Sequence, residues 1–261
     1  MRRATRAKIA LAFSGLCIAV LVGGFAVLAS LHQRAAVLRP SPEMAQDSGE
    51  SAVPTHDENG FPIVDWDYWQ GVNADVIGWI TIPGTPVDYP IVQAPADDPD
   101  YYLKRDVYGQ YNYMGCPYLD AGCAEDGIFG SRNAVIFGHN MGFGDTAMFN
   151  AVASFTDAGF ACDHNRVLIQ TPEEKRIYEV QAADCIGGWE TDKRTEFEND
   201  ADFAQWYDRR FAEADMHLAA SADTDRIVTL CTCSYNYWSD NERTVVYAAP
   251  AEVYPANGSE Q

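Results

Sequence analysis

The chain has 261 residues, of which 38 are acidic and 18 basic, giving a net charge of −20 at neutral pH. This length fits one or two domains. A surface this acidic repels phosphate backbones, which excludes nucleic acid as a natural partner.

The N-terminal region predicts export. Residues 9–31 are a 23-residue apolar run without a charge, and a helix of that length, about 34 Å, crosses a bilayer. Residues 1–8 are basic and form a cytoplasmic tail, since positive charge stays inside. A cleaved signal peptide, with Val27 and Ala29 near the cut site, is the alternative, although its apolar core would be shorter. Either way, residues 32–261 are exported, and we expect a single-pass membrane protein with an extracellular domain.

The exported part divides into three segments. Residues 32–60 are rich in Pro, Ser, Gly and acids, which predicts a flexible spacer. We expect one compact catalytic domain over residues 61–253 and a short tail over 254–261.

Within the domain, a short helix is predicted to start near Asp65, followed by a series of strands. Strand-like runs of β-branched and aromatic residues occupy 79–83, 87–93, 134–139, 166–171, 176–186, 226–233 and 243–249. Between the last strands, apolar residues recur every three or four positions from Phe203 to Leu218, which predicts an amphipathic helix capped by Asn199. Many short strands with one inserted helix predict a mainly β fold, a small barrel with helical additions.

Six cysteines lie in the exported part, where disulfides are permitted. Cys116 and Cys123 flank a Pro/Gly loop that a bridge could close, and Cys162 with Cys185 is a second candidate pair. The sequence proves neither bridge.

One histidine stands apart from the others. His139 closes an apolar strand and precedes a glycine-rich loop, a place where side chains meet substrate. His56, His164 and His217 lie in the spacer, a polar loop and a helix end, and are expected to be solvated or capping residues.

Cys231 and Cys233 end the strand run over residues 226–233. They share one face of the strand about 6.6 Å apart, at the outer edge of disulfide geometry, so a bridge between them is disfavoured. If the run forms a hairpin with the strand at 243–249, Cys233 and Arg243 face each other at its mouth. A guanidinium beside a thiol lowers the thiol pKa and offers donors to an oxyanion, and His139 would add an acid/base. The alternative is a buried structural cysteine and a surface arginine.

Three motifs in order resemble the sortase family of cysteine transpeptidases. TLCTC matches the signature T-L-x-T-C and carries Cys233; FGHNM carries His139; NERTVVYA carries Arg243. The stretch NADVIGWITIPGTPVDYPIVQ, the DYYL of residues 100–103 and the long helix between the last strands are similar to class B sortases. The resemblance covers about residues 61–250 and implies a sortase-like eight-stranded β-barrel with an N-terminal helical region, its long helix inserted before the penultimate strand.

The resemblance also implies roles. Cys233 would be the nucleophile, His139 the acid/base and Arg243 the group that stabilises the oxyanion and substrate. Leu103, Phe137, Cys231 and Thr232 would line the substrate groove.

Three positions depart from the class B pattern. Cys231 stands where Ser is common, Phe137 where Tyr is common, and Ser234 where an acid often follows the nucleophile. Because these positions surround the groove, the departures bear on which signal is read more than on the chemistry.

The implied partners are the sorting-signal peptide of a surface protein and, as acceptor, an amine of a cell-wall precursor or a pilin lysine. No cofactor or metal is expected, because the acidic run at residues 97–100 lacks calcium-loop spacing. Two other readings stay open: a secreted cysteine peptidase that hydrolyses the same bond, and a non-catalytic surface barrel whose thiols are all bridged.

Overall fold

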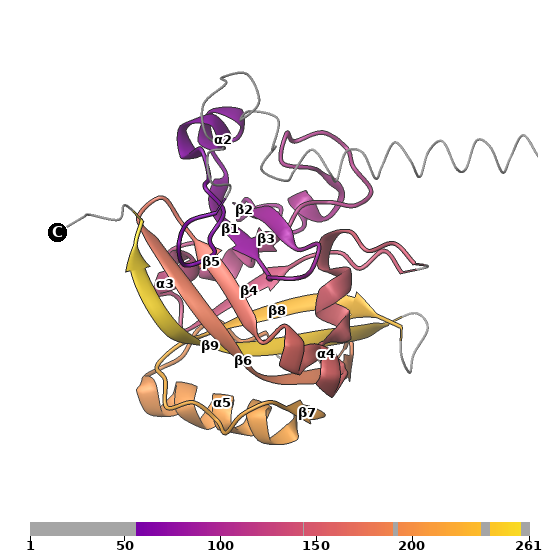
Figure 1. Ribbon diagram of the computed structural model, residues 1–261, viewed down its shortest axis with the longest axis vertical. Helices are drawn as coiled ribbons and strands as arrows, with labels where there is room; N and C mark the ends of the chain where they lie inside the picture. Colours follow the sequence, from indigo (N-terminus) through magenta and orange to yellow (C-terminus); the bar gives the residue numbers. More distant parts are fainter. Residues whose placement is uncertain (1–55, 143, 190–192, 236–240, 257–261) are drawn as a thin grey trace, which may run out of the picture. The chain divides into compact units, whose positions relative to one another are not determined.

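Figure 1 shows a computed structural model of the chain, which describes residues 56–142, 144–189, 193–235 and 241–256. The expected basic tail, the expected anchor at 9–31 and most of the spacer lie outside the described residues. Within the part that is described, no helix is both long and apolar enough to cross a membrane.

Eight strands close into a β-barrel, as predicted. They are β1 (Val76–Thr81), β2 (Asp88–Gln93), β3 (Tyr118–Leu119), β4 (Asn133–Phe137), β5 (Arg166–Gln170), β6 (Glu174–Gly187), β8 (Ile227–Ser234) and β9 (Glu242–Pro255). Their order is β5-β1-β2-β3-β4-β8-β9-β6, and the pairing of β5 with β6 closes the ring. A two-residue strand, β7 (Met216–His217), pairs with β6. Closure leaves the main strands without the unpaired edges that promote aggregation.

The seven predicted strands are all present, and the differences have simple causes. β3 and β7 have two residues each, too few for a period-2 pattern to be visible in sequence. β9 extends past the predicted 243–249, because it pairs with β6 from Glu242 opposite Gly187 to Pro255 opposite Glu174.

The parallel pairing of β4 with β8 matters most for the candidate site. Their register places Phe137 opposite Cys231 at the carboxyl ends of both strands. Since β8 also pairs antiparallel with β9, the end of β4, the end of β8 and the start of β9 meet at one end of the barrel.

Short helices connect the strands. They are α2 (Trp66–Val72), η2 (Tyr101–Lys104), η3 (Ala121–Cys123), α3 (Gly127–Gly130), η4 (Met148–Thr156), α4 (Ala158–Asp163) and α5 (Asp200–Glu213). The predicted start near Asp65 is confirmed, since its carboxylate caps α2 by accepting from the amide of Tyr68 at 2.9 Å. Asn199 caps α5 in the same way through the amide of Asp202. As predicted, α5 lies between β6 and the penultimate barrel strand β8.

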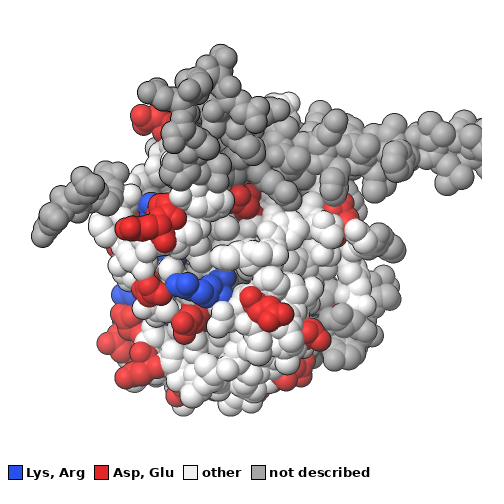
Figure 2. Space-filling view, in the orientation of Figure 1, with Lys and Arg blue, Asp and Glu red and all other residues white. Residues whose placement is uncertain are grey.

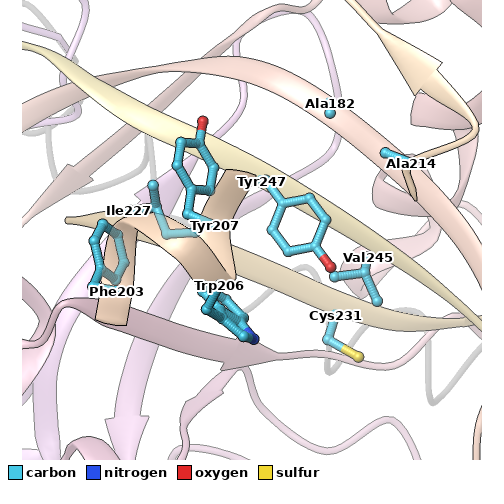
Figure 3. Packing of buried hydrophobic residues seen from close by; sticks show 9 residues of the cluster. All are labelled: Ala182, Phe203, Trp206, Tyr207, Ala214, Ile227, Cys231, Val245 and Tyr247. Atoms are coloured by element: carbon cyan, nitrogen blue, oxygen red, sulfur yellow. The ribbon is translucent and has the colours of Figure 1, made fainter. Parts of the chain in front are cut away.

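The apolar face of α5 packs against the barrel (Figure 3). Phe203, Trp206 and Tyr207 are buried against residues of β6, β8 and β9, among them Cys231 and Tyr247. Burying an aromatic side chain of this size contributes about 2–3 kcal/mol, so these three residues are enough to hold the helix in place. They form core, as the sequence pattern suggested.

The surface charge follows the composition. On the face in Figure 2, Asp and Glu side chains are spread widely and the Lys and Arg side chains gather in a smaller area. Ion pairs such as Arg166–Glu252, at 2.7 Å, are half exposed and contribute at most about 1 kcal/mol each. On this face, the described basic residues therefore do not form an extended surface for a phosphate backbone.

Candidate active site

The β8–β9 ladder brings Cys233 and Arg243 together. In the register of the two antiparallel strands, Cys233 is directly opposite Arg243 and Ser234 is opposite Glu242. The predicted hairpin mouth is thus confirmed. Cys233 is partly exposed, and Arg243 donates from Nη1 to the carbonyl of Glu242 at 2.9 Å.

His139 comes from the neighbouring strand end. It stands two residues beyond Phe137 on β4, as Cys233 stands two residues beyond Cys231 on β8, and Phe137 and Cys231 are register partners. The amide of Gly138 also donates to the carbonyl of Cys231 at 3.2 Å. The parallel ladder therefore delivers His139 and Cys233 to the same end of the barrel.

A backbone carbonyl holds the imidazole. Nε2 of His139 lies 2.7 Å from the carbonyl oxygen of Leu103, and since a carbonyl can only accept, Nε2 carries the proton. Burial lowers the pKa of His139; the carbonyl of Leu103 opposes this, and the charges of Lys104 and Arg243 lower it further. The ring is therefore neutral near pH 7, with its Nδ1 lone pair available as a base.

A glycine makes room for this contact. Gly115 has φ +62°, and a Cβ there would lie 2.8 Å from the carbonyl oxygen of Leu103 and 3.2 Å from Cδ2 of His139. The same Cβ would be 2.7 Å from the carbonyl oxygen of Tyr102. The turn that packs against the His139 ring therefore requires glycine.

Further hydrogen bonds join the two strand ends. Thr232 donates from Oγ1 to the carbonyl of Gly138 at 2.8 Å. Asn140 donates from Nδ2 to the carbonyl of Cys233 at 2.9 Å. Hydrogen bonds thus join the segment carrying the histidine to the segment carrying the cysteine on both sides of His139.

One cavity of about 330 Å³ is lined by all the residues to which the resemblance gave a catalytic or groove-lining role. The predicted residues that line it are Leu103, Phe137, His139, Cys231, Thr232, Cys233 and Arg243. Its volume is at the lower end of the range of about 300–1,000 Å³ that is usual for ligand sites, and the partly exposed thiol of Cys233 is part of its lining.

Four residues that line this cavity were not among those predicted for the site. Asp100, Tyr118, Asp120 and Lys193 line it. Nζ of Lys193 lies 3.4 Å from Oδ2 of Asp120 and 5.2 Å above the ring of Phe137, which packs on Tyr118 with ring centroids 5.3 Å apart. Tyr118 lies in β3, whereas Asp100, Asp120 and Lys193 lie in separate segments outside the strands. The four share no sequence pattern, so only the folded chain reveals the group.

Cys231 behaves as a core residue although it touches the cavity. The residue is 3 % exposed and packs in the cluster beneath α5 (Figure 3). Burial raises the pKa of Cys231 to about 12, and the charge of Arg243 offsets this only in part. A thiol with this pKa is protonated near pH 7 and is a poor nucleophile.

The two suggested disulfides are not formed. Cys116 and Cys123 are free, buried thiols that point at different backbone carbonyls, those of Pro90 at 3.7 Å and Asn133 at 3.3 Å. Cys162 is a free thiol on the surface, which rules out its bridge. With Cys231 and Cys233 also free, the reading of a barrel whose thiols are all bridged is wrong.

A larger cavity of about 600 Å³ lies elsewhere, between the β1–β2 turn and the start of β5. His56, Asp88 and His164 are among its lining residues, and none of the residues predicted to act on substrate belongs to it. Nδ1 of His164 lies 3.0 Å from the carbonyl oxygen of Pro83, so this histidine supports the turn. Size alone does not make this cavity the reactive one.

Comparison with known proteins agrees with the geometry. The family model described as Sortase domain matches residues 80–251. Sortase B of Staphylococcus aureus (strain NCTC 8325 / PS 47) is 26% identical over 221 residues, which cover 82% of this chain and 85% of that protein.

Two solved structures share the fold at similar identity. A Staphylococcus aureus sortase B–substrate complex has a TM-score of 0.62 and 25% identity, covering 73% of this chain and 85% of the other. A sortase B complexed with triglycine has a TM-score of 0.61 and 26% identity, covering 73% and 86%. From the family match over most of the domain, the closed barrel and these relatives, we conclude that the chain belongs to the sortase family and is most like the class B sortases.

Proposed function

We propose that the chain is a cysteine transpeptidase that cleaves a sorting signal in surface proteins and transfers the acyl group to an amine. The observation that carries this is the convergence of Cys233, His139 and Arg243 on one cavity at the end of the barrel. One solved structure of similar fold is a sortase B bound to its substrate, and another is a sortase B bound to triglycine. These two complexes support a peptide donor and an amine acceptor for this chain.

In the acylation step, Cys233 attacks the scissile carbonyl carbon. Its proton goes to Nδ1 of His139, the nitrogen that the Leu103 contact leaves available. Arg243 donates to the oxyanion that forms on the former carbonyl oxygen. The tetrahedral intermediate collapses to a thioester, and the imidazolium returns the proton to the departing amine.

In the second step, an acceptor amine attacks the thioester carbon. Nδ1 of His139 removes a proton from the amine, and Cys233 leaves as a thiolate that regains this proton. The acceptor is an amine of a cell-wall precursor or a pilin lysine. Attack by water in place of the amine would give the peptidase reaction, so the product decides between the two.

We further propose that residues 9–31 anchor the protein in the cell membrane with the barrel outside, which places the cavity where surface proteins are processed. In membranes washed with alkaline carbonate, the full chain should stay in the pellet. A chain lacking residues 1–31 should appear in the supernatant. A full chain extracted by carbonate would contradict the anchor.

The chemistry is tested with the full chain in detergent, a panel of sorting-signal peptides and triglycine as acceptor, followed by intact mass. We expect an acyl adduct in wild type and in Cys231→Ala, but none in Cys233→Ala. Arg243→Ala should keep a thiol that alkylates yet lower the acylation rate about 10²–10³-fold, as loss of an oxyanion donor does. Formation of only hydrolysed product with triglycine present would favour the peptidase, and an adduct lost only in Cys231→Ala would refute the choice of nucleophile.

A further inference from the structure

The residue after His139 is tied to the backbone of Cys233. Asn140 is 6 % exposed, and its Nδ2 donates to the carbonyl oxygen of Cys233 at 2.9 Å. Its Oδ1 accepts from the amide of Gly142 at 3.0 Å and from Nδ2 of Asn150 at 2.9 Å. Both polar atoms of the buried side chain are thus in use, one toward the strand that carries the thiol and one toward the loop that follows the histidine.

The location of this contact is informative. The last register pair of the β4–β8 ladder is Phe137 opposite Cys231, two residues short of the predicted reactive groups. Beyond that pair the chain leaves β4, whereas β8 continues to Ser234, and the Asn140 amide connects the two segments at the level of Cys233 itself. The hydroxyl of Tyr235 adds a longer contact, 3.4 Å, to the carbonyl of Asn140.

We propose that Asn140 is a positioning residue that fixes the Cys233 backbone against the segment carrying His139. This proposal rests on the proposed function, because it takes Cys233 and His139 as the reacting pair. The direction of the Cα–Cβ bond of Cys233 follows from its backbone orientation, which the amide holds through the carbonyl. An error of about 1 Å in such an arrangement costs on the order of 10²-fold in rate.

The side-chain chemistry explains why this position carries asparagine. A primary amide offers a donor and an acceptor at once in a planar group. Aspartate would keep the acceptor for Gly142 and Asn150 but lose the donor toward Cys233. An apolar residue would lose both and leave the carbonyl of Cys233 without this partner.

The test is a double-mutant cycle on thiol reactivity that needs no peptide. In a Cys162→Ser background, which removes an exposed thiol, the rate of alkylation of Cys233 by iodoacetamide is measured at pH 7 by mass mapping. We expect His139→Ala and Asn140→Ala each to slow alkylation about tenfold, and the double variant to be no slower than His139→Ala, because residues that act as a unit are not additive. No slowing in Asn140→Ala, or slowing that persists undiminished in the His139→Ala background, would overturn the proposal.

Asn133→Ala is a matched control. Asn133 is a buried asparagine at the start of β4, the strand that leads to His139 and Asn140, and its Nδ2 also donates to a backbone carbonyl, that of Arg194, at 2.8 Å. Its loss should lower stability by a similar amount and leave the alkylation rate of Cys233 within about threefold of wild type. An equal slowing in Asn133→Ala would mean that any loosening of β4 suffices, which would also overturn the proposal.

Asn140→Asp guards against a folding defect, since it retains the loop contacts through its carboxylate oxygen. The negative charge of the new aspartate affects the alkylation of Cys233 whether or not His139 is present. Positioning is therefore measured only by the part of the slowing that is absent when His139→Ala is combined with Asn140→Asp. With a reactive sorting peptide, Asn140→Ala should lower kcat about tenfold or more and change KM less than about threefold. If none of the peptides forms an acyl adduct with the wild-type protein, the proposed function fails. The alkylation cycle still decides the role of Asn140 in that case.

Discussion

Gly115 offers a direct test of how the imidazole is held. In Gly115→Ala, an L-residue at φ +62° costs about 1–2 kcal/mol for its left-handed backbone. The new Cβ would lie 2.7 Å from the carbonyl oxygen of Tyr102 and 2.8 Å from that of Leu103, and overpacking of this kind adds about 1–3 kcal/mol. The free energy of unfolding should therefore fall by about 2–5 kcal/mol. Because the Leu103 carbonyl accepts the His139 hydrogen bond, acylation should also slow about tenfold or more.

Gly109→Ala separates the cost of the left-handed backbone from the cost of overpacking. Gly109 has φ +71° in the same loop, but the nearest atom to its Cβ would be the Tyr101 hydroxyl at 3.9 Å. This variant should lose only about 1–2 kcal/mol and keep the wild-type acylation rate. Urea titrations of both variants, monitored by tryptophan fluorescence, give the difference between their losses of unfolding free energy. Equal losses in the two variants, or an unchanged acylation rate in Gly115→Ala, would refute the reasoning.

Three further outcomes are expected. Burial lowers the pKa of His139 below its value in the unfolded chain, so the unfolded chain binds this proton more tightly and the free energy of unfolding declines as the pH drops below about 6.5. His139→Gln should flatten this decline between about pH 7.5 and 5. Iodoacetamide on the native chain should label Cys233 and spare Cys231, whereas denaturant should expose both, and native labelling of Cys231 would contradict its burial. Gly138→Ala should cost about 1–3 kcal/mol, because its Cβ would overlap the Phe149 ring, and Phe149→Leu should recover part of the loss.

The barrel strands and the long helix could be predicted because their signals are local. Alternating β-branched residues define β8, and a three-to-four-residue apolar period with Asn199 ahead of it defines α5. The pairing of Cys233 with Arg243 was also accessible, since two adjacent strands joined by a short loop fix their own register.

Other parts of the site have no signature in the sequence. Leu103 was expected to form a groove wall and lines the cavity, but it also contacts His139 through its carbonyl, a group that every residue has. Asp120 and Lys193 are 73 positions apart and meet only through tertiary packing. The suggested bridge between Cys116 and Cys123 was wrong because closeness in sequence does not aim two side chains at each other.

The β8–β9 ladder has a consequence for how such a chain can change over time. Backbone hydrogen bonds of the ladder set the register that puts Cys233 opposite Arg243. Side chains elsewhere can therefore be exchanged while these two residues stay opposed. Leu103 and Phe137 lie on other segments yet line the same cavity, so a library randomised at those two positions would vary the lining of the cavity without changing the β8–β9 register.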